Sequence, residues 1–502
     1  MTIRILFGTT GWPCGLHEVA SQVVRLGLAE AMILPLGELF DRTLRDFRPH
    51  LVGLRIEGGQ SEAVRESIAA IRRRIDTTIV LGGPTATSHP VEVLETTDAD
   101  YVFAGDAEIP LTKFLQAAQS TNLRDLATEI PGLAYRWGEH TVVNLPKEDL
   151  CNGREVPQVD EETLRTNRLN WSLLEGFTQP LDSLYFTGGR GCPGRCTFCA
   201  RLHGSRVRTK TARQLIDEIR DADRLVREGR LKLNRWNLYA ETEDAARQSS
   251  VVAWCAVFDE DFFLDKKRAV EFLQLWDFYR LGERYRLNFQ TNPCSLLDRT
   301  DEADRAIFHW ISRTKSMIQL GAESFHPALL RRWNKRHTTE QLETVLTALD
   351  ATGQDYNVFH LQTDYRTTLD ELLESSDLLL RATKRHQRMR IASSPLTIPL
   401  YDTDIRRELE YTGKFRAKDF TAYETPCPEL LSPDVLELAE RLDEALQGAL
   451  HLPSRAEALG NVDDLLGRQV DRYNSGSRFE SNRNPMTDHE LAVSEEVSVG
   501  RR

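Results

Sequence analysis

The stretch SLYFTGGRGCPGRCTFCARLHG, residues 183–204, places Cys192, Cys196 and Cys199 within eight residues of one another. It opens as a short apolar run typical of a β-strand and continues into a glycine-rich loop. Three thiolates at this spacing suit an iron–sulfur cluster, because soft sulfur ligands match iron. With three protein ligands, a [4Fe–4S] cluster keeps one iron open, and that iron can bind a chelating ligand.

Zinc is the alternative metal for a cysteine-rich loop. Its structural sites normally have four Cys or His ligands, and His203, four residues after Cys199, is the candidate for the fourth. The glycine-rich context after a strand favours the iron–sulfur cluster. The other cysteines are scattered and are expected to be free thiols: Cys14, Cys151, Cys255, Cys294 and Cys427.

Beyond the cysteine loop, short apolar runs alternate with amphipathic segments. Candidate strands cover 183–187, 251–258, 286–290, 316–321, 356–361 and 388–393. Helical patterns such as 211–226, 266–280 and 339–352 lie between them. Six βα units in a row predict an open, partial (β/α)6 TIM-type barrel, with functional groups at the carboxyl ends of its strands.

The first 120 residues show a similar alternation. Candidate strands cover 3–7, 51–56, 78–83 and 99–105, and helical patterns cover 18–30, 61–75 and a segment from about residue 108. Residues 132–143 resemble a hairpin. This order predicts an α/β domain with a doubly wound, parallel, Rossmann-like sheet, whose ligands bind beyond the carboxyl ends of the strands.

We therefore expect four regions along the chain: a Rossmann-like domain (1–143), a linker (144–180), the partial barrel (181–405) and a C-terminal extension (406–502). Turn formers and charges dominate the linker. The extension begins with helical patterns, and its last 30 or so residues are polar, lack periodicity and are expected to be disordered.

The bulk properties of the 502-residue chain restrict its partners. Its formal net charge of −12 argues against general nucleic-acid binding. No apolar run reaches the roughly 18 residues of a membrane span, and the N-terminus lacks the pattern of a signal peptide. We expect a cytoplasmic protein without nucleic-acid or membrane partners.

The cysteine stretch, with the aromatic Phe198 before its last cysteine, resembles the signature of the radical S-adenosylmethionine (SAM) superfamily. The resemblance covers roughly residues 180–405. It implies a [4Fe–4S] cluster on Cys192, Cys196 and Cys199, whose open iron binds SAM. In that family an electron donor such as flavodoxin or ferredoxin drives the cleavage of SAM to a 5′-deoxyadenosyl radical.

Further segments of the predicted barrel resemble the same family. VFDEDFF (257–263) resembles its second-strand acidic segment, and LGAESF (320–325) its fourth-strand motif. The segments RRWNKRHTTEQ (331–341) and PLTIPLYDT (395–403) complete the match. The resemblance implies that these segments bind SAM through Asp259, Glu260, Gly321, Glu323 and Ser324. In 331–341, Thr338 and Thr339 are expected to cap the next helix.

The N-terminal domain resembles the cobalamin-binding domain of one radical SAM subclass, in RPHLVGLRI (48–56), IVLGGPTATSHP (79–90) and ADYVFAGDAEIPLTKFL (99–115). The resemblance implies that Gly82 and Gly83 let the backbone approach the nucleotide tail of cobalamin, and that Gly105, Asp106 and Glu108 shape another wall. The loop GTTGWPCGLHE (8–18) lacks the D-x-H-x-x-G motif of many cobalamin proteins, so we expect no ligand role for His17.

Two reactions fit this combination. The leading hypothesis is a cobalamin-dependent C-methyltransferase acting on a small molecule in specialised metabolism. The alternative is a cobalamin-independent dehydratase or deoxygenase acting on a sugar or aminosugar, with a degenerate N-terminal domain. That reaction needs a general acid, for which Glu323, Asp364 and Tyr401 are candidates. The full set of barrel motifs disfavours a non-catalytic carrier of a corrinoid or cluster.

Overall fold

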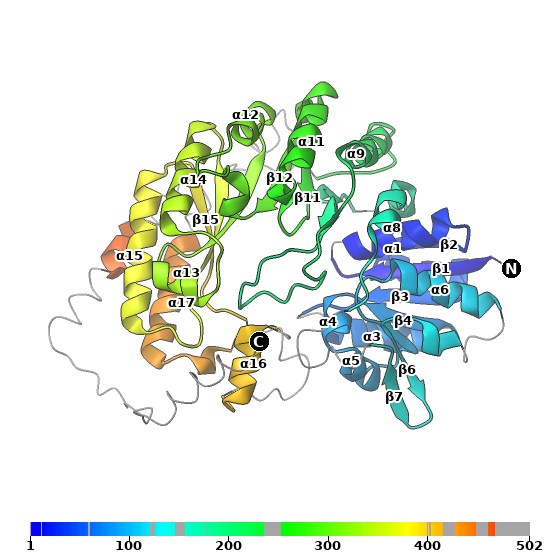
Figure 1. Ribbon diagram of the computed structural model, residues 1–502. Coiled ribbons are helices and arrows are strands. Elements are labelled where there is room, and N and C mark those ends of the chain that lie inside the picture. Colours follow the sequence, from blue (N-terminus) through cyan, green and yellow to red (C-terminus); the bar gives the residue numbers. More distant parts are fainter. Residues whose placement is uncertain are drawn as a thin grey trace, which may run out of the picture.

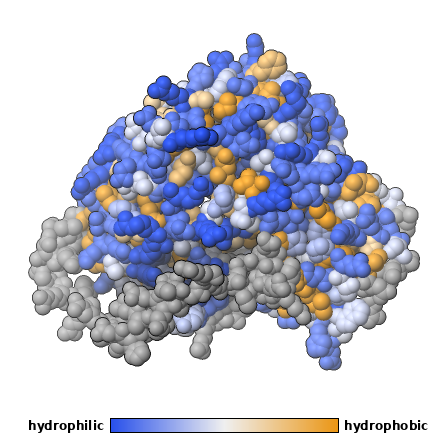
Figure 2. Space-filling model, viewed as in Figure 1, coloured by the Kyte–Doolittle hydropathy of each residue, from blue (hydrophilic) through white to orange (hydrophobic). Residues whose placement is uncertain are grey.

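The computed structural model describes residues 2–11, 13–58, 61–120, 126–145, 156–177, 179–234, 253–398, 400, 403–414, 427–447 and 460–466. These residues form two α/β units side by side (Figure 1). The face seen in Figure 2 is mostly hydrophilic, with apolar residues in small, separated groups. Among the described residues, no helix has both the length and the apolar character needed to cross a membrane.

The N-terminal sheet has the strand order β2-β1-β3-β4-β5-β6-β7. Its strands are β1 (Ile3–Thr9), β2 (Ala29–Pro35), β3 (Leu51–Arg55), β4 (Thr78–Gly82), β5 (Tyr101–Phe103), β6 (Leu133–Trp137) and β7 (His140–Val143). Its helices are α1 (Cys14–Arg25), α2 (Glu38–Phe47), α3 (Ser61–Arg72), α4 (Pro84–Ser88), α5 (Pro90–Thr96) and α6 (Glu108–Gln119). β1 to β5 pair in parallel, and the β6–β7 hairpin joins β5 antiparallel.

Separate apolar cores on the two faces of this sheet make it doubly wound, as predicted. Side chains of α1 and α6, such as Val23 and Phe114, pack on one face, and side chains of α3 and α5, such as Ile68 and Val93, pack on the other. The helix expected over 18–30 is wrong in its second half. Gly27, with φ +68°, lies just beyond α1, and the chain then forms β2.

The second sheet has the order β15-β14-β13-β12-β11-β8, and all its pairs are parallel. All six predicted strands are confirmed: β8 (Ser183–Phe186), β11 (Ala253–Val257), β12 (Tyr285–Thr291), β13 (Met317–Glu323), β14 (Tyr356–Leu361) and β15 (Met389–Ser394). Consecutive strands lie side by side and a helix follows most of them, as in a partial barrel.

Helices cover the outer face of this sheet (Figure 1): α9 (Ala212–Arg227), α11 (Lys266–Phe278), α12 (Arg305–Thr314), α13 (Pro327–Arg332), α14 (Thr339–Ala351) and α15 (Leu369–Arg385). Thr338 caps α14, as predicted, through a capping box with Gln341. The C-terminal helices are α16 (Asp404–Tyr411) and α17 (Pro433–Gln447). The expected disordered tail lies outside the described residues.

The segment expected as a linker is packed where the structure describes it. It contains α8 (Glu161–Thr166) and the 3₁₀ turn η3 (Trp171–Leu174). Trp171 is 2% exposed, and its ring lies 5.0 Å from that of His17 and 5.1 Å from that of Tyr185. This segment therefore joins the two units through a shared apolar core.

Candidate functional site

The cysteine loop leaves the barrel at β9 (Gly189–Arg190) and returns at β10 (Arg208–Thr209), which pairs antiparallel with β9. Gly194 lies beside two of the thiols. A β-carbon on this residue would lie 3.2 Å from Cys192 Sγ and 4.0 Å from Cys196 Sγ. The glycine therefore keeps room around both sulfurs, while Cys199 is exposed.

The chemistry of this loop fits a cluster better than zinc. Burial raises the pKa of the Cys192 and Cys196 thiols, so metal ligation would be needed to hold them as thiolates. Among the described residues, no three His, Cys, Asp or Glu side chains converge on a single ion. A cluster needs no such convergence, because each thiolate binds its own iron. His203, the candidate fourth zinc ligand, places Nδ1 2.8 Å from Asp106 Oδ1 instead.

The two acidic residues after β11 lie in different surroundings. Asp259 is 4% exposed and accepts the N–H groups of Gly188 and Gly189 on Oδ1, both at 2.7 Å. Its Oδ2 pairs with Arg268 at 2.5 Å, so Asp259 anchors the start of the cysteine loop. Glu260 is half-buried, and among the described residues its carboxylate accepts only the N–H of Gly191, at 3.1 Å. Of the two predicted SAM contacts, Glu260 has the more accessible carboxylate.

The end of β13 holds the next group of predicted residues. Glu323 has a positive φ of 64° at an irregularity of the sheet, and its Oε1 lies 3.3 Å from Lys335 Nζ. A β-carbon on Gly321 would lie 3.1 Å from that oxygen, so the glycine makes room for the ion pair. Ser324 is fully buried and accepts the N–H of His326. Backbone strain of this kind clusters at functional sites.

Phe198 lies against the segment that follows α13. Its ring meets that of Trp333 edge-on at 6.2 Å, and Lys335 Nζ lies 5.9 Å from the Phe198 centroid. Trp333 Nε1 donates to Asp364 Oδ2 at 2.7 Å, and Arg332 pairs with the same oxygen. Asp364 thus fixes the positions of Trp333 and Arg332. Tyr401 lies outside the described residues.

A cavity of about 390 Å³ opens at the carboxyl edge of the N-terminal sheet and is closed by the barrel. This volume is in the range of small-molecule and cofactor sites. Its lining includes Gly82, Gly83, Gly105 and Glu108 from the first domain. Thr187, Arg190, His203 and Phe258 line it from the second. The cavity therefore lies between the predicted cobalamin residues and the cysteine loop.

Three of the glycines that line this cavity were expected beside cobalamin, and they have different roles. A β-carbon on Gly82 would meet only the backbone oxygen of Phe103, at 4.0 Å, so this residue borders open space. Gly83 has φ +114°, and its β-carbon would lie 2.8 Å from the backbone oxygen of Ile56. A β-carbon on Gly105 would lie 2.4 Å from the backbone oxygen of Pro157. Gly82 therefore fits the expected role of leaving room for a ligand. Gly83 and Gly105 are glycines because a β-carbon there would collide with the backbone of the chain itself.

His17 is fully buried at the junction of the two domains. Its Nε2 lies 2.9 Å from the backbone oxygen of Asn170, and its Nδ1 lies 3.2 Å from the hydroxyl of Tyr185. Burial lowers its pKa to about 4. Both ring nitrogens therefore have partners within the chain.

Ion pairs between buried side chains connect the domains, and sequence reasoning did not predict these pairs. Lys210 is fully buried and contacts Glu18 at 2.9 Å and Glu218 at 3.1 Å. The carboxylate of Asp106 pairs with Arg190, Arg208 and His203. Glu108 pairs with Arg190 as well. Apart from Lys210–Glu218, these pairs join residues far apart in sequence, so no local sequence pattern predicts them.

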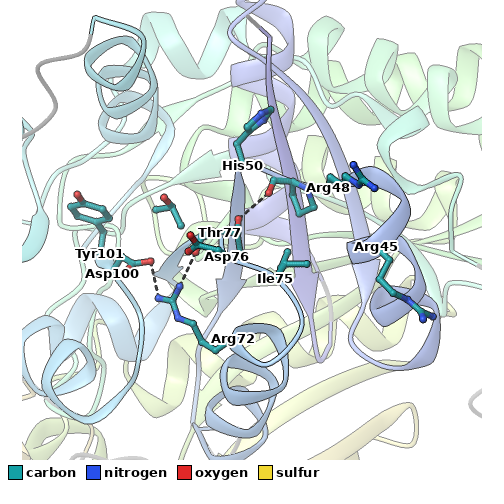
Figure 3. A pocket seen from close by; sticks show the side chains of 11 residues that line it. Arg45, Arg48, His50, Arg72, Ile75, Asp76, Thr77, Asp100 and Tyr101 are labelled. Carbon is teal, nitrogen blue, oxygen red and sulfur yellow. Dashed lines mark hydrogen bonds and ion pairs between the residues drawn. The ribbon is translucent and has the colours of Figure 1, made fainter.

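Another cavity, of about 860 Å³, lies at the opposite edge of the N-terminal sheet. Figure 3 shows Arg72 between Thr77 and Asp100, with His50, Arg45 and Arg48 around them. Arg72 donates to Thr77 O at 2.7 Å and pairs with Asp100 at 2.8 Å. The amino ends of the strands form this depression, away from the cysteine loop.

No family model matches the chain. A protein of Methanocaldococcus jannaschii named as a methylthiotransferase, MJ0865, is 25% identical over 161 residues, which is 31% of this chain and 31% of that protein. The alignment thus spans under a third of that relative.

Two solved structures are similar to most of the chain. OxsB, a cobalamin-dependent SAM radical enzyme solved with aqua-cobalamin and SAM bound, has a TM-score of 0.69 at 15% identity, over 99% of this chain and 75% of that one. TsrM of Kitasatospora setae, a radical SAM methyltransferase solved with cobalamin and a [4Fe–4S] cluster, has a TM-score of 0.61 at 17% identity, over 82% and 75%. At these identities the likeness shows a shared fold.

Proposed function

We propose that this chain, whose fold is that of a radical SAM enzyme with an N-terminal domain of the cobalamin-binding type, is a cobalamin-dependent C-methyltransferase. Its substrate would be a small molecule of specialised metabolism. The cavity between the glycine edge of the first domain and the cysteine loop of the second carries this proposal.

The cofactors would supply a radical that removes a substrate hydrogen atom, and a methyl group that replaces it. The chain contributes binding and orientation. Cys192, Cys196 and Cys199 would hold the cluster, and Gly194 would keep space for it. A flavodoxin or ferredoxin would deliver the electrons.

The barrel mouth offers charges of both signs for SAM. Glu260 and Glu323 provide carboxylates for its cationic amino group, and Lys335 provides an ammonium group for its carboxylate. Phe198 and Trp333 add an apolar wall that excludes water from one side of the site. These roles are proposals that follow from position and charge.

The arrangement of His17 favours a second candidate function, a cobalamin-independent dehydratase or deoxygenase. Both nitrogens of His17 are engaged, so this residue offers no cobalt ligand. In that reaction Glu323 would serve as the general acid, because burial raises its pKa. Asp364 and Tyr401 remain the other candidates.

One experiment separates the two functions. The protein is reconstituted anaerobically with iron, sulfide and hydroxocobalamin, then incubated with candidate metabolites and methyl-labelled SAM. We expect one equivalent of bound cobalamin and transfer of the labelled methyl group to carbon. Turnover of a substrate by protein that contains no cobalamin would refute the methyltransferase proposal in favour of the lyase.

A further inference from the structure

Buried charges tie both limbs of the cysteine loop to the first domain. Arg190 lies two residues before Cys192, and its side chain is 5% exposed. It pairs with Asp106 Oδ1 at 2.9 Å and with Glu108 Oε1 at 2.6 Å. On the returning limb, His203 Nδ1 lies 2.8 Å from the same Asp106 oxygen. The loop therefore takes its position partly from the turn between β5 and α6.

One oxygen of Glu108 has no partner among the described residues. No described group donates a hydrogen bond to its Oε2, and the whole residue is only 1% exposed. The side chain lines the cavity between the domains. Buried acceptors are nearly always satisfied in proteins, so an occupant of the cavity that donates a hydrogen bond would complete this one.

The charges around the cavity indicate which donor fits. Its lining contains the basic side chains Arg55, Arg190 and His203 and the carboxylates Asp106 and Glu108, and Arg190 already pairs with both carboxylates. A second cation at Glu108 would meet the charge of Arg190 at close range. A neutral N–H group avoids this cost. Corrinoids carry carboxamide side chains around their ring, and these are neutral N–H donors.

We propose that Glu108 is a positioning residue that links the occupant of the cavity to the cysteine loop. Its Oε2 accepts a hydrogen bond from a carboxamide N–H of the bound corrinoid, while its Oε1 holds Arg190. This inference rests on the proposed function, since it takes a corrinoid as the occupant. Because one carboxylate makes both contacts, binding in the cavity orders Glu108 and, through Arg190, the backbone beside Cys192.

The test uses the full chain with its cluster reconstituted and hydroxocobalamin as the probe. Absorption titration gives the affinity, and electron paramagnetic resonance (EPR) of the reduced cluster, without and with hydroxocobalamin, reports the coupling. Glu108→Gln keeps the shape and removes the charge. We expect unchanged iron content, about tenfold weaker binding, and no EPR change on adding hydroxocobalamin. The control Glu92→Gln, on the exposed surface of α5, should behave as wild type.

The outcomes distinguish this inference from the function on which it rests. If wild type binds one equivalent and Glu108→Gln matches it in affinity and EPR response, the inference is overturned and the proposed function stands. If wild type binds no hydroxocobalamin, both are overturned. Should Glu108→Gln fail to fold, Arg190→Lys decides the matter: loss of the EPR response supports the link, and a response equal to that of wild type overturns it.

Discussion

A β-carbon on Gly83 would lie 2.8 Å from the backbone oxygen of Ile56, whereas one on its neighbour Gly82 would meet only a single atom, at 4.0 Å. Gly83 also has φ +114°, a conformation that side chains rarely adopt. The glycine that ends β4 and the glycine of the following turn therefore have different structural roles. Gly83 allows the chain to turn, and Gly82 leaves the cavity open.

Because of this difference, valine at the two positions should change two different properties, ligand binding at Gly82 and stability at Gly83. Gly82→Val should fill part of the cavity and weaken hydroxocobalamin binding at least about tenfold, with folding and iron content unchanged. Gly83→Val should destabilise the fold by roughly 1–3 kcal/mol through backbone strain. Absorption titration and urea unfolding measure the two effects. Gly460→Val, at a site with open space around it, is the control. Equal cobalamin affinity in Gly82→Val and wild type would contradict the placement.

A second pair of variants separates support of the loop from SAM binding. Asp259→Ala leaves Arg268 buried without its partner, which typically costs about 3–5 kcal/mol, and should lower stability and iron loading. Glu260→Gln should keep the iron and weaken SAM binding about tenfold. Iron analysis, urea unfolding and equilibrium SAM binding distinguish them. Unchanged SAM affinity in Glu260→Gln would remove that residue from the proposed site.

His17 should make stability depend on pH. Its pKa of about 4 in the folded chain lies below the ordinary 6.5, so the unfolded chain binds more protons between these values. Its contribution is present above pH 6.5 and is lost as pH falls toward 4. A shift of this size corresponds to about 3 kcal/mol. Urea midpoints across this range should fall less steeply in His17→Gln than in wild type. Exposed His140→Gln should keep the wild-type slope, and parallel slopes in all three proteins would refute the assignment.

Periodicity and caps predicted much of the fold. The six barrel strands stand out as short runs rich in apolar residues, and Thr338 caps its helix as expected. β2 was missed because its sequence AEAMILP is rich in helix-forming residues, and its pairing with β1 decides its conformation. The local sequence pattern therefore predicts secondary structure best where residues close in sequence decide the conformation.

The candidate site was predictable in part. The cysteine spacing is local and readable, and so are the glycines of the sheet edge. The contacts of Arg190 with Glu108 and of Lys210 with Glu18 span 82 and 192 residues, so they depend on how the two domains meet. Asp259 makes its anchoring contacts within the barrel, with Gly188, Gly189 and Arg268. The sequence alone does not show which of the two neighbouring acidic residues, Asp259 or Glu260, makes them.

The central claim, that Cys192, Cys196 and Cys199 hold a cluster that cleaves SAM, is tested most directly by the formation of 5′-deoxyadenosine. The assay compares reduced, reconstituted wild type with Cys196→Ala and with Cys427→Ala, a buried thiol outside the loop. We predict about four irons and 5′-deoxyadenosine for wild type and Cys427→Ala, and none of this product for Cys196→Ala. Wild-type levels of 5′-deoxyadenosine from Cys196→Ala would contradict the account.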